Sequence, residues 1–171
     1  GFIGCLLYEA GFDLVFLDVN QDVVSELNSH DSYKVIETGA GARTHEVKNF
    51  KAFNSQTQFE EAAEVIAKAQ VVTTSVGVNI LKFLAPLIVA GLEKRAADKP
   101  LIVMACENAI GATDILRSEI EKHADNVTLS RGTFANTAVD RIVPLQPDGH
   151  GLDVTVESFC EWVIDRSAFA G

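Results

Sequence analysis

The sequence predicts an α/β protein with a doubly wound, mostly parallel sheet and a strand-rich C-terminal part. Continuous apolar runs recur along the chain without the alternation of a half-exposed strand, as expected of parallel strands covered on both faces. Segments with apolar residues at helical spacing separate these runs. Such alternation is typical of a doubly wound sheet, and the length of 171 residues suits one domain.

The chain opens with a predicted helix, a buried strand and a second helix. Residues 1–11 carry an apolar helical face and end at Gly11, since glycine commonly follows the last turn of a helix. The segment FDLVFLDVN contains the strand, predicted for 13–18. Asn20 is expected to cap the next helix by accepting a hydrogen bond from its first turn. The polar stretch 33–54 favours short antiparallel strands.

The middle of the chain continues this alternation, with Gly77 expected in a turn and Pro86 expected to bend a long helix. From Val127 onward the pattern changes to short strands with little helix. Helices are predicted at 57–69, 78–99 and 109–124, buried strands at 70–75 and 100–108, and the strands of the tail within 127–146, 151–158 and 161–165.

Charge and cysteine content exclude several classes of function. The net charge of −10 and the lack of a basic stripe argue against a nucleic-acid partner. Cys5, Cys106 and Cys160 are odd in number, far apart and embedded in apolar stretches. They are therefore predicted to be reduced core cysteines, without a disulfide or a metal site.

The histidines show no spacing typical of metal ligands. All four lie in polar surroundings and are predicted to be surface residues, namely His30, His45, His123 and His150.

Neither a membrane span nor a secretory signal is predicted. No apolar run reaches the roughly 18 residues of a transmembrane helix, and no signal-peptide pattern is present. A cytoplasmic location is expected, with a small-molecule substrate, no membrane partner and a sequence compatible with a monomer. The chain does not begin with methionine and its only methionine is Met104, so we expect the natural start to lie upstream.

Asp18 ends the first predicted strand with a carboxylate. In a nucleotide-binding βαβ unit, an acid at this position accepts hydrogen bonds from the adenosine ribose hydroxyls. The alternative is a helix cap or a solvated strand end. Residues 19–24 contain no Lys or Arg that could bind a 2′-phosphate, so this position favours NAD over NADP.

Two further strands end in small or polar residues. TTSVG closes the strand 70–75, and its small side chains would let a ligand approach the backbone beyond the carboxyl end of the strand. An ordinary strand-to-helix turn is the alternative there. ACENAIGATD follows the next strand, where the amide of Asn108 would donate to a developing alkoxide or carbonyl oxygen, or else cap the next helix.

FANTAVDRIVP, residues 134–144, places Asn136, Asp140 and Arg141 within an apolar stretch. Adjacent Asp and Arg side chains point in different directions on most backbones, so each is expected to find a separate partner. A buried structural ion network is the alternative to a functional role, because such charges are seldom buried unpaired.

Five segments, ILKFLAPLI, CENAIGATD, FANTAVDRIVP, GLDVTVESF and EWVIDR, together resemble the mannitol-1-phosphate 5-dehydrogenase family of polyol-specific long-chain dehydrogenases. The likeness covers essentially the whole chain, in order and with matching spacing, and is closest to the fungal members. It implies a Rossmann-type NAD-binding domain over 1–171, whose first strand and glycine-rich loop would precede Gly1. A helical C-terminal domain carrying a general-base lysine would follow in the complete enzyme.

The resemblance also implies a reaction and the roles of several residues. The reaction is metal-independent, NAD-dependent interconversion of D-mannitol 1-phosphate and D-fructose 6-phosphate by hydride transfer. Asn108 and Asp140 would support catalysis, Asn108 as a donor to the reacting oxygen and Asp140 close to the reacting centre. The residues that the resemblance places at the cofactor are Gly1, Asp18, Ser75, Val76, Gly77 and Asn108.

Three other functions stay open at this point. Another polyol or hexuronate long-chain dehydrogenase would share the fold and the cofactor. An S-adenosylmethionine methyltransferase also places an acid after its second strand, but CEN and VDRIVP have no counterpart there. A non-catalytic nucleotide-binding domain would bind NADH without turnover. We expect the isolated chain to lack turnover, because the phosphate-binding turn and the general base would lie outside it.

Overall fold

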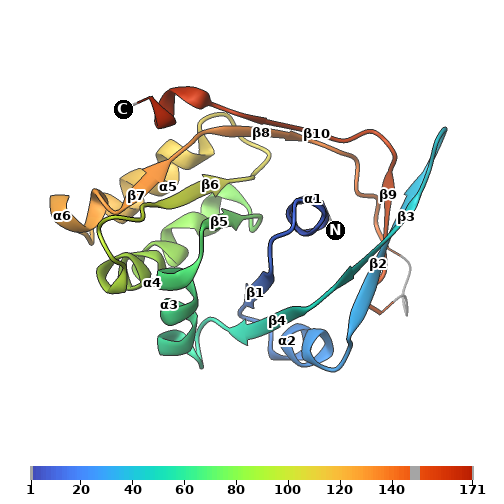
Figure 1. Cartoon of the computed structure of the whole chain (residues 1–171), viewed down its shortest axis with the longest axis horizontal. Helices are drawn as coiled ribbons and strands as arrows, with labels where there is room; N and C mark the ends of the chain where they lie inside the picture. Colours follow the sequence, from blue (N-terminus) through green and yellow to red (C-terminus); the bar gives the residue numbers. More distant parts are fainter. Residues whose placement is uncertain (1, 147–150, 171) are drawn as a thin grey trace. The chain divides into compact units, whose positions relative to one another are not determined.

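A computed structural model describes residues 2–146 and 151–170 of the chain. These residues divide into two compact units, which are treated separately below. The first unit comprises residues 1–58 and 140–161, and the second comprises residues 59–139 and 162–171. Figure 1 labels the helices and strands of both.

The described residues of the first unit form two helices and five strands in two small sheets. Its helices are α1 (Ile3–Glu9) and α2 (Gln21–Asn28), and its strands are β1 (Leu14–Asp18), β2 (Ser32–Thr38), β3 (Thr44–Lys48), β4 (Phe50–Asn54) and β9 (Val154–Glu157). β1 pairs with β4 in parallel, whereas β2 lies between antiparallel β3 and parallel β9. Figure 1 shows β9 beside β2 although the two are far apart in the sequence.

The prediction of short antiparallel strands within 33–54 is confirmed for β2 and β3 and wrong for β4. Asn49 separates β3 from β4 with a left-handed φ of 56°, a conformation that asparagine tolerates better than most residues. The chain therefore leaves the β2–β3 hairpin at this residue, and β4 pairs with β1 instead of folding back on β3.

Two predicted helix boundaries are confirmed, the C-terminus of α1 and the N-terminus of α2. Gly11 has a φ of 88°, and its N–H donates to the carbonyl of Tyr8 at 2.9 Å, so it closes α1 as a C-cap glycine does. Asn20 caps α2, because its Oδ1 accepts a hydrogen bond from the N–H of Asp22 at 2.9 Å.

Apolar residues from α1 and from four strands form the core of the first unit. Phe16, Tyr33 and Phe50 pack edge to face, with ring centroids 5.3 to 6.3 Å apart, an arrangement that favours aromatic pairs. The buried members of the cluster are Cys5, Leu14, Tyr33, Val35, Val47 and Val156.

The second unit is a parallel three-stranded sheet with helices packed beside it. The strands follow the order β5 (Val71–Thr74), β6 (Leu101–Ala105) and β7 (Gly132–Phe134), and both pairings are parallel. α4 (Leu81–Lys94) packs between α3 (Phe59–Lys68) and α5 (Ala112–Glu121) (Figure 1). The shorter elements are η1 (Val78–Ile80), α6 (Asn126–Leu129) and η2 (Arg166–Phe169), and β8 (Thr137–Asp140) pairs with β10 (Glu161–Ile164).

The α/β class, the mostly parallel pairing and the strand-rich C-terminal part are as predicted. The described strands pair in four small sheets. β1 and β5 each pair with a single described strand, so each keeps one edge that no described strand covers. None of the helices within residues 2–146 and 151–170 has both the length and the hydropathy needed to cross a bilayer.

The helix predicted over 78–99 ends earlier, at Lys94. Arg95 turns to an extended conformation, and its buried guanidinium donates to the carbonyls of Ala67 at 2.8 Å and Ala69 at 2.5 Å. A buried cation needs such acceptors. This tertiary contact therefore ends the helix at Lys94, although the sequence pattern predicted a helix as far as residue 99.

Thr113 joins the end of the central strand to the chain beyond β7. Its fully buried Oγ1 accepts a hydrogen bond from the N–H of Ala105 at 2.9 Å and donates one to the carbonyl of Ala135 at 2.9 Å. One hydroxyl thus satisfies two backbone groups that β-ladder pairing leaves free, which holds the carboxyl edge of the sheet together.

Gly91 sets the distance between α3 and α4. A Cβ at this position would lie 2.2 Å from Cγ2 of Ile66 and 3.3 Å from the carbonyl oxygen of Ala63. We expect Gly91→Ala to destabilise the protein by about 1–3 kcal/mol through overpacking, although alanine is the better helix former. Chemical denaturation measures this change.

Gly4→Ala is the matched control for Gly91→Ala, since a Cβ there would make ordinary contacts of 3.5 Å with Phe16 and Tyr33. The double variant Gly91→Ala, Ile66→Ala should lose less unfolding free energy than the sum of the losses of the two single variants. Equal stability of the two glycine variants would contradict this account of the α3–α4 contact.

Candidate functional site

Asp18 lies at the carboxyl end of β1 in the first unit, as predicted. Its Oδ1 accepts a hydrogen bond from the N–H of Asn20 at 2.8 Å, and its backbone carbonyl accepts one from the N–H of Ser55 at 2.9 Å. No described residue donates a hydrogen bond to Oδ2, and the side chain is half-buried. The carboxylate is thus oriented by its own turn and retains an oxygen that could accept a further hydrogen bond.

Asn54 supports this end of the first unit, a role that sequence reasoning missed. The side chain is buried, and its Oδ1 accepts from the N–H groups of Gln56 and Thr57, both at 3.0 Å. Its Nδ2 donates to the carbonyl of Val19 and to Oε1 of Gln21, both at 3.1 Å. Asn54 therefore ties the turn after β4 to the turn that follows Asp18. Asparagine at the start of the polar run NSQT was the available signal.

Glu107 anchors the turn after β5 in the second unit. Its buried carboxylate accepts hydrogen bonds from the hydroxyl of Thr74 at 2.6 Å, from the N–H of Val76 at 3.0 Å and from the N–H of Gly77 at 2.8 Å. Gly77 has a φ of 90°, which only glycine adopts without strain. The turn 75–77 thus lies exposed at the carboxyl edge of the sheet, and its backbone N–H groups are hydrogen-bonded to the buried Glu107 carboxylate.

Cys106 precedes Glu107 and is chemically inert. Burial raises the pKa of its thiol to about 12, and the charge of Glu107 contributes to the same shift. Reactive cysteines need a lowered pKa and access to solvent, so Cys106 is a core residue, as the sequence predicted.

Asn108 is exposed at the carboxyl end of β6 and is not a helix cap. α5 begins at Ala112 after Gly111, whose φ of 67° and missing side chain define that helix end. Among the described residues, no hydrogen bond engages the Asn108 side chain. Of the two predicted alternatives, the cap is therefore wrong, and the amide is available to an external partner.

The prediction that Asp140 and Arg141 each have a separate partner is confirmed for Arg141, whereas no described residue bonds to the Asp140 side chain. Asn136 donates a hydrogen bond to Asp114 Oδ2 at 2.7 Å, which joins the end of β7 to the first turn of α5. Asp140 is exposed at the end of β8. Arg141 is buried, with its side chain 2% exposed, and donates to Glu37 Oε1 at 2.8 Å.

The Glu37–Arg141 pair is a structural ion pair in the first unit. Burial opposes the ionisation of Glu37, but hydrogen bonds from His45, the Arg43 N–H and Arg141 outweigh it and hold the pKa of that carboxyl below its usual value. Arg141 also donates to the carbonyl of Glu157 at 2.9 Å. The pair is thus compensated on both sides, the condition under which buried charges are tolerated.

His45 corrects the prediction that the histidines lie on the surface. Its side chain is 11% exposed, and its ring lies between the carboxylates of Glu9 and Glu37. Alternation of side chains along β3 directs it inward, which its polar sequence neighbours concealed. His30 and His123 are exposed, while His150 lies outside the described residues, as does Gly1.

The predicted site residues fall into two groups. In the second unit, the turn 75–77 follows β5, and its Val76 and Gly77 N–H groups are bound to Glu107, the residue before Asn108, beyond β6. In the first unit, Asp18 and Asp140 each end a strand. All of them occupy the carboxyl ends of strands, where open α/β sheets bind ligands.

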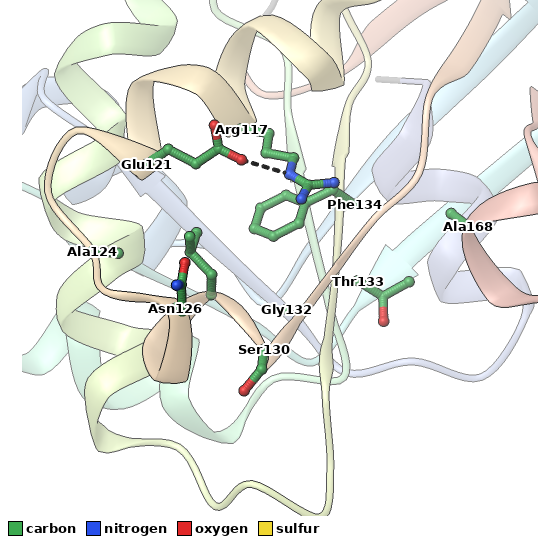
Figure 2. Close-up of a pocket in the computed structure, with 10 residues that line it drawn as sticks. Arg117, Glu121, Ala124, Asn126, Ser130, Gly132, Thr133, Phe134 and Ala168 are labelled. Atoms are coloured by element: carbon green, nitrogen blue, oxygen red, sulfur yellow. Dashed lines mark hydrogen bonds and ion pairs between the residues drawn. The ribbon is translucent and has the colours of Figure 1, made fainter. Parts of the chain in front are cut away.

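A cavity of about 640 Å³ lies elsewhere in the second unit. Arg117 of α5 extends over the Phe134 ring and pairs with Glu121 at 2.9 Å, as Figure 2 shows. Ser130 and Gly132 line the cavity at the amino end of β7, and none of the predicted site residues lines it. Because ligands of this architecture bind at carboxyl ends, we do not assign the cofactor to this cavity.

Comparison with known proteins identifies the family. The sequence profile of the mannitol dehydrogenase Rossmann domain matches residues 1–171. The chain belongs to this family. In the structure, the parallel pairings of the mannitol dehydrogenase Rossmann domain are those of β1 with β4, of β2 with β9, and of β6 with β5 and β7.

Relatives of this Rossmann domain are named mannitol-1-phosphate 5-dehydrogenase. Those from Arthrobacter sp. (strain FB24) and Aspergillus clavatus are 54% and 49% identical over 173 and 174 residues. Each match covers 99% of this chain and 45% of the relative, so the chain spans a little under half of their length. The bacterial relative is the more similar of the two, which corrects the expected closeness to fungal members.

A solved structure supports the fold of the mannitol dehydrogenase Rossmann domain. The PanE/ApbA family ketopantoate reductase from Ralstonia eutropha JMP134 superimposes with a TM-score of 0.58 at 19% identity. The match covers 95% of this chain and 44% of the other. At this identity the likeness shows the fold alone.

Substitution of Glu107 tests whether it holds the turn 75–77. We expect Glu107→Gln to speed amide hydrogen exchange at Val76 and Gly77 and to lower stability by about 1–3 kcal/mol, because one amide oxygen cannot replace two carboxylate oxygens. Exchange is measured by NMR or mass spectrometry. Glu61→Gln, on the exposed surface of α3, should change neither quantity. Unchanged exchange in Glu107→Gln would remove Glu107 from this role.

Proposed function

We propose that the chain is the cofactor-binding part of an NAD-dependent polyol-phosphate dehydrogenase that interconverts D-mannitol 1-phosphate and D-fructose 6-phosphate. The observation that carries the proposal is the edge beyond β5 and β6, where Glu107 holds the turn 75–77 and the next residue, Asn108, is exposed. Membership of the mannitol dehydrogenase Rossmann domain family supports a nicotinamide cofactor and a polyol substrate. The names of the relatives support the specific reaction.

The residues at the end of β1 fit the ribose of NAD. Asp18 retains an oxygen for a ribose hydroxyl, while its other oxygen is held by Asn20. Asp22 is the only charged side chain in residues 19–24. A 2′-phosphate at Asp18 would meet like charge without a compensating base, at a cost of about 1–4 kcal/mol depending on exposure. The position therefore favours NAD over NADP.

The residues at the carboxyl edge of the second unit fit the reacting end. NAD, when bound, supplies the hydride acceptor of the alcohol oxidation. The small side chain of Ser75 and the absent one of Gly77 permit close approach to the turn. Asn108 offers an N–H donor to the substrate oxygen, which gains negative charge as its proton leaves. Asp140 is proposed to support this centre.

Cofactor preference tests the role of Asp18. In the complete enzyme that contains this chain, Asp18→Ser should relax the preference for NAD over NADP, because it removes the repulsion of a 2′-phosphate. The ratio of kcat/KM for the two cofactors measures this preference. Asp22→Ser is the matched control and should leave NAD as the preferred cofactor. Equal use of both cofactors by the unmodified enzyme would refute the assignment.

Substitution of Asn108 tests the proposed donor. Asn108→Ala in the complete enzyme should lower kcat by roughly 10²–10³, because the donor acts on charge that develops in the transition state. The affinity for NADH should change little, since Asp18 is proposed to hold the adenosine end. The melting temperature should also stay unchanged, because Asn108 caps no helix. A variant with intact kcat would remove Asn108 from the site.

Substrate choice separates the proposed function from its alternatives. The assay uses the complete enzyme that contains this chain. Its turnover of fructose 6-phosphate with NADH supports the proposal. Turnover of only an unphosphorylated polyol or a hexuronate would assign it to a different long-chain dehydrogenase. NADH binding without turnover of any of these substrates would leave a nucleotide-binding domain without catalysis. Asn108→Ala and Asp18→Ser then distinguish the reacting end from the adenosine end.

A further inference from the structure

The first unit brings a thiol, a carboxylate and an imidazole together on α1 and β3. Cys5 and Glu9 are four residues apart on α1 and so share one face of the helix, and His45 faces them from β3. The ligand atoms of these three side chains all lie within 4.8 Å of one another. Within residues 2–146 and 151–170, no other group of three or more His, Cys, Asp or Glu side chains is this close.

The imidazole of His45 lies between two carboxylates. Nδ1 lies 2.5 Å from Glu9 Oε1, and Nε2 lies 3.0 Å from Glu37 Oε1. A neutral imidazole has one N–H, whereas two ionised carboxylates offer only acceptors. The 2.5 Å contact is a hydrogen bond, so a metal ion at Nδ1 requires the Glu9 carboxylate to move away from the ring.

Glu37 determines which ring nitrogen remains for a metal. Its side chain is 7% exposed and is also held by Arg141 at 2.8 Å and by the Arg43 N–H at 3.0 Å, so it is fixed in place. With the N–H of His45 on Nε2 and directed to Glu37, the lone pair of Nδ1 points to Glu9 and Cys5. A carboxylate that orients a histidine through its other nitrogen is the usual partner of a metal-binding histidine.

We propose that Cys5 Sγ, Glu9 and His45 Nδ1 bind a zinc ion in the first unit. Sulfur, nitrogen and oxygen donors together suit zinc, which prefers four ligands in a tetrahedron. Bonds of about 2.0–2.3 Å separate tetrahedral ligand atoms by roughly 3.3–3.6 Å. Glu9 is 46% exposed, so its carboxylate is free to withdraw by about 1 Å, and a water from the same side supplies the fourth ligand.

The zinc ion would join α1 to β3 and stabilise the first unit. Because zinc binds the thiolate, its binding releases the thiol proton of Cys5 to solvent. The ion takes no part in hydride transfer, so this inference stands independently of the proposed function.

Cobalt(II) titration of the metal-stripped protein tests the site. We expect a thiolate-to-cobalt charge-transfer band in the near ultraviolet and the visible bands of tetrahedral cobalt, saturating at one equivalent and lost on addition of zinc. Cys5→Ser should remove the charge-transfer band. Glu9→Gln and His45→Gln should weaken cobalt binding by roughly tenfold or more. Zinc should raise the melting temperature of the unmodified protein.

Two matched variants control for the loss of a cysteine or a histidine. Cys106→Ser and His123→Gln alter residues of the second unit and should leave the band and the affinity unchanged. Glu37→Gln should weaken cobalt binding by roughly 10–100-fold and retain the charge-transfer band, since Glu37 orients His45 without contacting the metal.

The outcomes that would overturn the zinc site are specific. They are the absence of a thiolate band, a band that survives Cys5→Ser, or a band that Cys106→Ser removes. Circular dichroism checks that each variant is folded. If Cys5→Ser does not fold, Glu9→Gln decides, because its exposed side chain is dispensable for packing. Unchanged cobalt affinity in Glu9→Gln would then refute the site.

Discussion

The Glu107 carboxylate determines the form of the carboxyl edge in the second unit. A buried carboxylate is costly unless donors surround it, and here the donors are Thr74, Val76 and Gly77. The turn after β5 must therefore keep the conformation that presents these groups, including the positive φ of Gly77. The chain bends after β6, with Glu107 buried and the next residue, Asn108, exposed.

Other buried polar groups act in the same way at strand and helix ends. Thr113 closes the carboxyl end of β6, Asn54 closes the end of β4, and Arg95 ends α4. Each satisfies backbone groups that secondary structure leaves free, which is the general requirement for buried N–H and C=O groups. These contacts place exposed, small or polar residues at the strand ends, where a ligand can reach them.

Residues 140–161 of the first unit are attached to its remaining residues by an ion pair and by strand pairing. β9 extends the β2–β3 sheet, and Arg141 pairs with Glu37 of β2. Glu37 in turn orients His45. Arg141 thus influences the surroundings of α1. In the motif VDRIVP the arginine has a structural role, and the aspartate is exposed with no hydrogen bond to a described residue.

The sequence by itself determined the α/β class, the helix caps and the strand ends that carry the candidate site. Apolar runs, Gly11, Asn20 and the residues after each strand are local signals, and local physics decides them. Family membership likewise followed from motifs such as CENAIGATD and FANTAVDRIVP.

Only the tertiary structure decided which polar residues point inward and what they bind. His45 has polar neighbours in the sequence, yet the pleat of β3 and the carboxylates of Glu9 and Glu37 bury it. β4 pairs with β1 and Arg95 ends α4 through partners distant in the chain. A side chain's orientation depends on the partner that compensates its burial, and that partner is set by the folded chain and not by the adjacent residues.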